Sequence, residues 1–373
     1  MNSRRDFLTI AAAGSALAAG GMVTGQAARA APGESSTTGS AHFVPPFKFG
    51  LGGVPLGNEF EVITDDDAHA TLDAAWTAGV RYFDVAPWYG LGLAERRYGA
   101  FLHGKNRDDY VLSSKVGKLL KASPKNDAKS NFPFTPSPNN VVFDYTADGV
   151  RRSVEDSLQR LGVSHLDIVF VHDISADNKL LPTPWEQQFD IALKGAFPAL
   201  AQMKSEGTIR GWGIGVNTPE PILRLMREAD PDLCLLASQY SLIDHANALD
   251  HVFPMARQRN IKFVVGSSLN AGFISGRPRY NYGKQSWDIP RAHLDKREKL
   301  RAVAAQFGVD LRTAALRFSA APDVAAALVV GAHTAAQVLE NVTSMQTTIP
   351  PAFWTELKQQ KLIADNAPIP VEA

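Results

Sequence analysis

Short apolar runs alternate with longer stretches of helical periodicity along most of the chain. The short runs are rich in β-branched and aromatic residues, which favours strands. The longer stretches repeat apolar residues at helical spacing, as do residues 148–161. Strands are therefore expected at residues 47–53, 81–85, 110–115, 166–171, 208–215, 233–239, 261–265 and 324–330, each followed by a helix.

These eight strand-then-helix units predict the fold class. Strands separated by helices pair in parallel through crossover connections. Eight such units favour an α/β protein with a closed (β/α)8 TIM barrel over an open doubly wound sheet. An open dinucleotide-binding sheet would carry Gly-x-Gly-x-x-Gly after its first strand, whereas this chain has Gly50-Leu-Gly-Gly-Val-Pro. The barrel is expected at residues 43–373, with a long Pro-, Asn- and Lys-rich loop from Lys118 to Tyr145.

The N-terminal 42 residues show a different pattern. Arg4 and Arg5, followed by Phe7 and Leu8, precede an apolar Ala/Gly-rich stretch. This arrangement resembles the twin-arginine export signal of bacteria, and small residues at 28–30 fit a cleavage site. Residues 1–30 are interpreted as a removable signal peptide and residues 31–42 as a flexible linker. The apolar stretch is shorter than the ~20 residues of a membrane span, which favours cleavage over an uncleaved anchor. The sequence therefore predicts a periplasmic or secreted protein that is exported by the twin-arginine machinery.

Composition narrows the function classes. The chain has 38 Lys+Arg and 38 Asp+Glu, so its net charge is +0 and no basic patch argues for nucleic acid. A single cysteine, Cys234, excludes an intrachain disulfide. A chain that forms no intrachain disulfide can fold in the reducing cytosol before it is exported. His69, His245 and His251 lack the spacing of a metal site, and none is expected.

Four polar residues lie at or just after the ends of three predicted strands. Asp84, Lys115 and His172 are at strand ends, and Tyr89 is in the loop after Asp84. The C-terminal ends of barrel strands converge on one mouth, where the chemistry takes place. A phenol titrates near pH ~10, and a nearby ammonium lowers that pKa. Lys115 and Asp84 would tune the pKa of Tyr89, and His172 would orient a substrate oxygen. This set suits proton transfer coupled to hydride transfer, although each residue alone also has a structural explanation.

The motifs around these four residues resemble those of the aldo-keto reductases. The matching segments are residues 84–90 (DVAPWYG), 113–115 (SSK) and 171–173 (VHD), and the similarity extends from Phe47 to Ile363. Residues 49–58 and 68–79 are similar to the aldose and pyridoxal dehydrogenase branch of that family. The resemblance implies a nicotinamide-dependent barrel enzyme with a small-molecule substrate.

The resemblance also implies a reaction. Tyr89 would donate or accept the proton, while hydride moves between nicotinamide and an aldehyde, ketone, alcohol or lactol carbon of a sugar-like substrate. Trp88, next to Tyr89, is a candidate for substrate binding, with packing at the rim as the alternative. Trp185, in a Pro-rich loop, has the same two interpretations.

Most of the expected cofactor contacts come from the same resemblance, while Gly53 is expected because glycines at the end of a strand let a ligand approach the backbone closely. The residues concerned are Gly53 for close backbone approach, Asn217 and Gln239 for the carboxamide, Ser267 and Leu269 for the pyrophosphate, and Gly331, Gln337 and Asn341 for the adenosine. One member of the family's Ser-Asn pair is missing beside Asn217, and Gly266 replaces a common aromatic residue.

The last of these motifs bears on the choice between NAD and NADP. A 2′-phosphate favours a bidentate cation, and the motif offers Gly331, His333 and Gln337 instead. NAD, or dual use, is therefore expected over strict use of NADP.

A second hypothesis belongs to another class of protein. Nicotinamide cofactors are scarce outside the cytosol, so an exported barrel could bind cofactor without turnover, as a sensory or regulatory subunit. The substrate, the direction of the reaction and the oligomeric state stay open.

Overall fold

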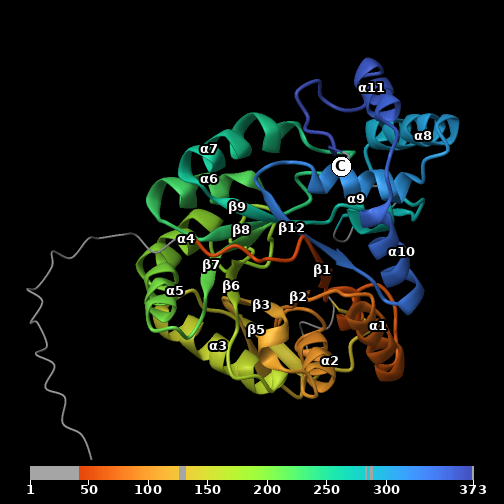
Figure 1. Cartoon of the computed structure of the whole chain (residues 1–373). Helices are drawn as coiled ribbons and strands as arrows, with labels where there is room; N and C mark the ends of the chain where they lie inside the picture. The colour runs from red at the N-terminus through yellow and green to blue at the C-terminus, as the bar shows by residue number, and fades with distance from the viewer. Residues whose placement is uncertain (1–41, 126–131, 282–283, 286–288, 372–373) are drawn as a thin grey trace, which may run out of the picture. The chain divides into compact units, whose positions relative to one another are not determined.

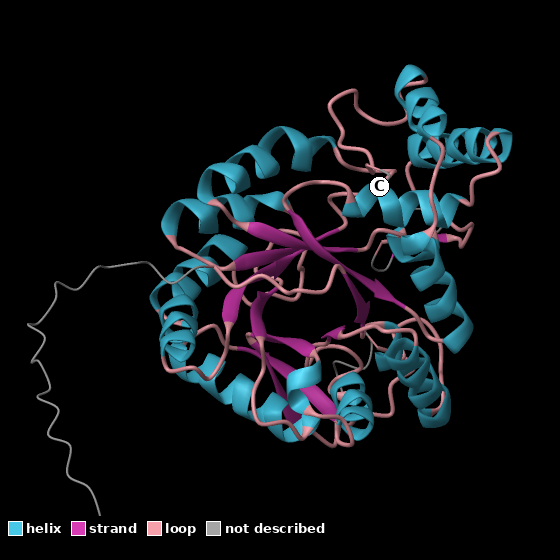
Figure 2. Cartoon of the chain, viewed as in Figure 1, coloured by secondary structure: helices cyan, strands magenta, loops and turns pink. Residues whose placement is uncertain are grey.

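Eight parallel strands form a closed barrel in the computed structural model (Figures 1 and 2). The structure describes residues 42–125, 132–281, 284–285 and 289–371, so the expected signal peptide and all but the last residue of the expected linker lie outside it. Around the barrel the strand order is β1-β12-β9-β8-β7-β6-β3-β2. The strands are β1 (Phe49–Gly52), β2 (Tyr82–Asp84), β3 (Val111–Val116), β6 (Ile168–His172), β7 (Gly211–Val216), β8 (Leu233–Ala237), β9 (Lys262–Gly266) and β12 (Ala325–Gly331). The predicted (β/α)8 barrel is confirmed.

Helices surround the barrel (Figure 2). They are α1 (Asp65–Thr77), α2 (Leu93–Leu102), α3 (Ala147–Leu161), α4 (Trp185–Lys194), α5 (Ala196–Ser205), α6 (Pro219–Glu228), α7 (Phe253–Arg259), α8 (Arg291–Gln306), α9 (Leu311–Ala320), α10 (Ala335–Gln346) and α11 (Pro351–Gln359). Thr64 begins α1 with a capping box to Asp67, and Gly162, at φ 64°, ends α3. Trp185, expected in a loop, instead begins α4. Across the described residues no helix has both the length and the apolar character that a membrane span requires.

Side chains alternate between the interior of the barrel and the helix layer. The interior cluster includes Tyr82 of β2, Val111 of β3 and Phe170 of β6, whereas Phe83, Leu112 and Val171 belong to the layer that packs against the helices. Because successive side chains of a strand point to opposite faces, positions two and four residues after an interior residue are also interior. This alternation directs the last polar residues of β2, β3 and β6 towards one mouth.

The segment from Lys118 to Tyr145, expected as a loop, contains an antiparallel hairpin. β4 (Lys118–Ala122) pairs with β5 (Asn139–Phe143). The expectation was wrong here because each strand has only two or three consecutive apolar residues beside Lys or Asn, with no alternation to indicate a strand. Tyr145, just after the hairpin, is buried and donates its hydroxyl to the backbone oxygen of His172 at 2.8 Å. The base of the hairpin is therefore attached to the end of β6.

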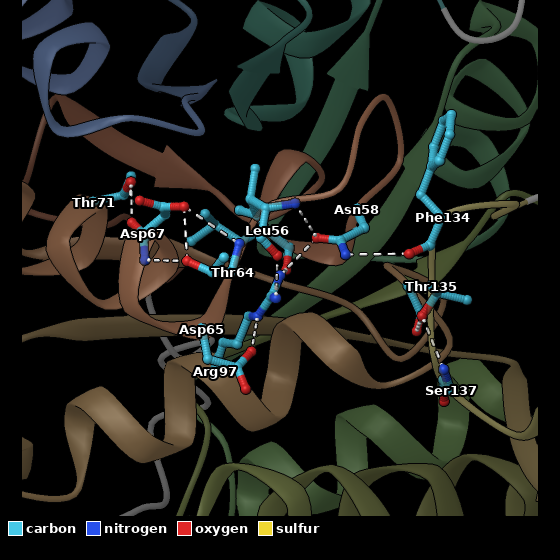
Figure 3. A network of polar contacts seen from close by, with 12 residues as sticks. Leu56, Asn58, Thr64, Asp65, Asp67, Thr71, Arg97, Phe134, Thr135 and Ser137 are labelled. Atoms are coloured by element: carbon cyan, nitrogen blue, oxygen red, sulfur yellow. Dashed lines mark hydrogen bonds and ion pairs between the residues drawn. The ribbon is translucent and has the colours of Figure 1, made fainter.

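Arg97 of α2 fastens the loop between β1 and α1 (Figure 3). Its guanidinium donates to the backbone oxygens of Leu56 and Ile63 and to Asn58 Oδ1, each at 2.8 Å. Asn58, whose backbone is left-handed at φ 59°, donates in turn to the backbone oxygen of Phe134 at 3.2 Å. Arg97 also pairs with Asp65, but that carboxylate is 83% exposed, so the pair adds little. The buried hydrogen bonds hold this loop in one conformation.

Candidate active site

Asp84, Tyr89, Lys115 and His172 meet at one end of the barrel. Lys115 Nζ donates to Asp84 Oδ2 at 2.8 Å and lies 4.7 Å from the centroid of the Tyr89 ring. The Tyr89 ring lies 5.9 Å from the His172 imidazole at an interplanar angle of 85°. Asp84, Lys115 and His172 come from the C-terminal halves of β2, β3 and β6, and Tyr89 comes from the loop after β2. The structure thus brings together all four residues predicted from the sequence.

The Lys115–Asp84 pair is almost completely withdrawn from water. The two side chains are 1% and 4% exposed. Ser113 Oγ donates to Asp84 Oδ1 at 2.7 Å, and Lys115 Nζ also donates to the backbone oxygen of Val85 at 3.0 Å. A buried charge is tolerated only when it is paired and hydrogen-bonded, and both conditions are met here. The pair keeps a positive charge beside the phenol ring.

His172 is held as a neutral imidazole. Burial, with the positive charges of Lys118 and Lys115, keeps the pKa of His172 well below its usual value. Its Nε2 atom lies 3.4 Å from Asp173 Oδ2, and its buried Nδ1 atom has no hydrogen-bond partner among the described residues. No hydrogen bond joins Nε2 to that carboxylate, so a hydrogen on Nε2 stays available to a ligand. Such an imidazole can donate a hydrogen bond to a substrate oxygen.

Two cavities adjoin at Tyr89. The hairpin-side cavity, of about 420 Å³, is lined by Lys118 of the hairpin and by Trp88, Lys115 and His172. The α10-side cavity, of about 320 Å³, extends past the ends of β9 and β12 to α10. Both cavities are lined by Val54, Tyr89, Leu235 and Ala237. Tyr89 is therefore accessible from both sides.

The cofactor residues predicted from the sequence divide between these cavities. The α10-side cavity is lined by Ser267, Leu269, Gly331, Gln337 and Asn341. Asn217 lines the hairpin-side cavity.

Gly53 and Gln239 line neither cavity. Gly53 donates its N–H to the backbone oxygen of Asp84 at 2.8 Å, and its neighbour Gly52 lines the α10-side cavity instead. Gln239 Nε2 donates to the backbone oxygen of Asn217 at 2.6 Å.

The α10-side cavity fits a nicotinamide dinucleotide. Small residues at strand ends, Gly52, Ala237 and Gly266, leave room for a planar ring beside Tyr89. Farther along, Ser268 Oγ lines the cavity, is buried and has no hydrogen-bond partner among the described residues. A buried hydroxyl without a partner fits a polar ligand group. Ser267 adopts a left-handed backbone at φ 60° in the turn after β9, a conformation that recurs at ligand sites.

Several charged residues of the two cavities were not predicted from the sequence. Glu59 and Lys118 line the hairpin-side cavity, and Arg312 and Arg279 line the α10-side cavity. Arg312 forms an ion pair with Glu340 across α9 and α10. The one sequence feature that points to any of these charged residues is that Lys118 follows Lys115 by three residues. Arg312 could not be predicted because the helical periodicity of a sequence does not determine how α9 is oriented relative to α10.

A closed barrel with a ligand cleft at the C-terminal ends of its strands is typical of barrel enzymes. The model of the aldo/keto reductase family matches residues 48–361. The chain belongs to the aldo/keto reductase family, whose members are oxidoreductases that use nicotinamide cofactors.

Three proteins illustrate the similarity. D-threo-aldose 1-dehydrogenase from a Pseudomonas species is 35% identical, with 84% of this chain and 94% of that protein aligned. Pyridoxal 4-dehydrogenase from Microbacterium luteolum is 33% identical, with the same 84% and 94% aligned. The holo form of an aldo-keto reductase from Bacillus halodurans has a TM-score of 0.65 at 25% identity and covers 84% of this chain and 91% of its own.

Proposed function

We propose that this protein moves a hydride between nicotinamide and an aldehyde or lactol carbon of a sugar-like substrate, with Tyr89 as proton donor and acceptor. The observation that carries the proposal is the position of Tyr89, where the two cavities adjoin, beside Lys115 and His172. The similarity to a D-threo-aldose 1-dehydrogenase supports a sugar-like substrate.

Each of the four residues has a separate task in this reaction. When bound, the nicotinamide supplies or accepts the hydride. Tyr89 passes its proton to the substrate oxygen during reduction and takes it back during oxidation. The ammonium of Lys115, 4.7 Å from the ring centroid, favours the phenolate. Asp84 holds that ammonium in place, and neutral His172 donates a hydrogen bond to the same substrate oxygen.

A substrate screen tests this function against the sensory alternative. The protein is mixed with aldoses, alcohols and aldehydes in the presence of NAD, NADP or their reduced forms, and the absorbance of the reduced nicotinamide is followed. We expect turnover with sugar-like substrates. Tight cofactor binding without turnover on any member of the panel would favour the sensory or regulatory subunit.

NAD is the preferred cofactor in this proposal. Glu340 and Glu61 both line the α10-side cavity, where Glu340 pairs with Arg312 and Glu61 lies 3.0 Å from His333 Nε2. The Glu340 carboxylate occupies Arg312, and both carboxylates repel a 2′-phosphate, whereas a ribose hydroxyl can donate to a carboxylate, as in other NAD sites. This distribution of charge favours the cofactor that lacks the phosphate.

Replacing Glu340 with Gln is expected to shift the preference towards NADP. The change removes a negative charge and frees Arg312 for a phosphate. We expect the ratio of kcat/KM for NADP to that for NAD to rise by about tenfold, the effect of one charge-assisted contact of ~1.4 kcal/mol. Steady-state kinetics with both cofactors measure the ratio. Glu155→Gln, on the exposed face of α3, is the control, and an unchanged ratio in E340Q would exclude Glu340 as the discriminating residue.

Export through the twin-arginine pathway remains part of the proposal. It is supported by Arg4 and Arg5 ahead of the apolar stretch and by the small residues at 28–30. Cell fractionation and mass spectrometry of the mature N-terminus test it, with a terminus near Ala31 as the expected result. A cytosolic protein that retains Met1 or Asn2 would overturn it.

A further inference from the structure

Glu59 places a buried carboxylate oxygen, Oε2, in the hairpin-side cavity. It lies on the loop between β1 and α1 and lines this cavity together with Tyr89 and His172. Its Oε2 atom is buried and accepts no hydrogen bond from the residues that the structure describes. A buried carboxylate oxygen normally has a donor. The chemistry assigned to Asp84, Tyr89, Lys115 and His172 does not use this group, so a ligand is its natural partner.

Lys118 and Asp173 add a second charged pair to the same cavity. Lys118 Nζ donates to Asp173 Oδ2 at 2.5 Å, and the two side chains are 2% and 17% exposed. An ammonium has three N–H donors, and this is the one hydrogen bond found for Lys118 Nζ among the described residues. The pair therefore offers both an acceptor and spare donors to a ligand in the cavity.

An aromatic surface lies beside these charges. Trp88 lines the cavity, with Lys118 Nζ 4.4 Å from its ring centroid and Phe132 packed edge-on at 4.9 Å. A carbon chain that carries hydroxyls has apolar C–H faces and polar edges. The C–H faces match the indole ring, and the hydroxyl edges match Glu59 and Lys118.

The loop that carries Glu59 is held in place before any ligand binds. Its neighbour Asn58 is fastened by Arg97 on one side and by the backbone of Phe134 on the other (Figure 3). Residues whose positions are locked by surrounding hydrogen bonds bind ligands at a low entropic cost. Glu59 therefore has the support expected of a binding residue.

We propose that Glu59 and the Lys118–Asp173 pair form a distal subsite that binds the hydroxyl groups of the substrate away from its reacting carbon. This proposal rests on the proposed function and adds residues that determine specificity. A substrate without distal hydroxyls offers no donor to the buried Oε2 atom of Glu59. Sites built to hydrogen-bond a hydroxyl can reject the analogue that lacks it by ~10⁴–10⁵-fold. The subsite thus selects polyhydroxylated aldehydes or lactols over plain aldehydes.

The charge state of Glu59 provides an independent readout. Burial raises the pKa of Glu59 to about 7, against the opposing charges of Arg279 and Lys118. The other titratable residues that line this cavity are Tyr89, Lys115, Lys118, neutral His172, Asp173, Asp177 and Lys179. The ionised carboxylate is the stronger acceptor, so selectivity for hydroxylated substrates should increase as the pH rises through about 7.

The experiment compares threose with butanal, which share a four-carbon aldehyde but differ in their hydroxyl groups. In wild-type protein we expect kcat/KM for threose to exceed that for butanal, and the ratio to rise between about pH 6 and about pH 8. Glu59→Gln should lower the ratio by ~10-fold and Glu59→Leu by ~100-fold, as expected for hydrogen bonds to a charged group. The ratio should no longer depend on pH in E59Q.

Controls separate this proposal from the proposed function. Glu155→Gln, the same change on the outer surface, should leave the ratio unchanged, and thermal unfolding shows whether each variant is folded. Equal losses on both aldehydes, or an unchanged ratio in E59L, would overturn the subsite. If wild-type protein turns over neither aldehyde, calorimetry with threitol tests the subsite: weaker binding to E59L supports it, and equal binding overturns it. The proposed function fails if the whole substrate panel is unreactive in both directions.

Discussion

Replacing Tyr89 with Phe is expected to lower turnover by ~10²–10⁴-fold while cofactor binding is retained. The change removes the hydroxyl that transfers the proton and keeps the ring that contacts Lys115 and His172. The cavity walls and the Lys115–Asp84 pair should therefore be preserved. Single-turnover kinetics measure the loss, and fluorescence titration of the reduced cofactor measures binding.

Tyr98→Phe is the matched control for this experiment. Tyr98 is fully buried, and its hydroxyl donates to the backbone oxygen of Leu51 at 3.2 Å, but it lines neither cavity. Its loss should cost about 1 kcal/mol of stability and leave turnover nearly unchanged. Turnover close to the wild-type value in Y89F would remove Tyr89 from its proposed role.

Replacing Lys115 with Met is expected to abolish turnover and to lower the free energy of unfolding by ~3–5 kcal/mol. Asp84, 4% exposed, would be left with Ser113 as its one remaining side-chain donor among the described residues. The double variant Lys115→Met with Asp84→Leu removes both charges and should regain much of the lost stability, because apolar replacements of a buried pair are often well tolerated. Urea denaturation and steady-state kinetics measure the two effects separately.

Two comparisons make this result decisive. Lys361→Met breaks a pair with Asp365 whose side chains are 72% and 69% exposed, so it should change stability by less than ~0.5 kcal/mol. A double variant that stays as unstable as K115M would show that the unpaired carboxylate is not the cause. A double variant that regains turnover together with stability would exclude Lys115 from the chemistry.

The barrel and the meeting of the four polar residues could be predicted from local pattern. Strands buried on both faces produce continuous apolar runs, so 166–171 and 324–330 were recognisable without any knowledge of their neighbours. The C-terminal ends of parallel barrel strands lie at the same mouth. Asp84, Lys115 and His172 therefore had to converge once the strands were placed.

The charged walls of the two cavities depended on the tertiary structure. Glu59, Lys118 and Arg312 reach the cavities through a fastened loop, a hairpin and the packing of α9 against α10. Local periodicity contains no information about the path of a loop or about the rotation of one helix relative to another. The order of the elements thus follows from the sequence, because burial repeats with a fixed period, whereas the polar contacts of the binding cavities follow from distances between residues far apart in the chain.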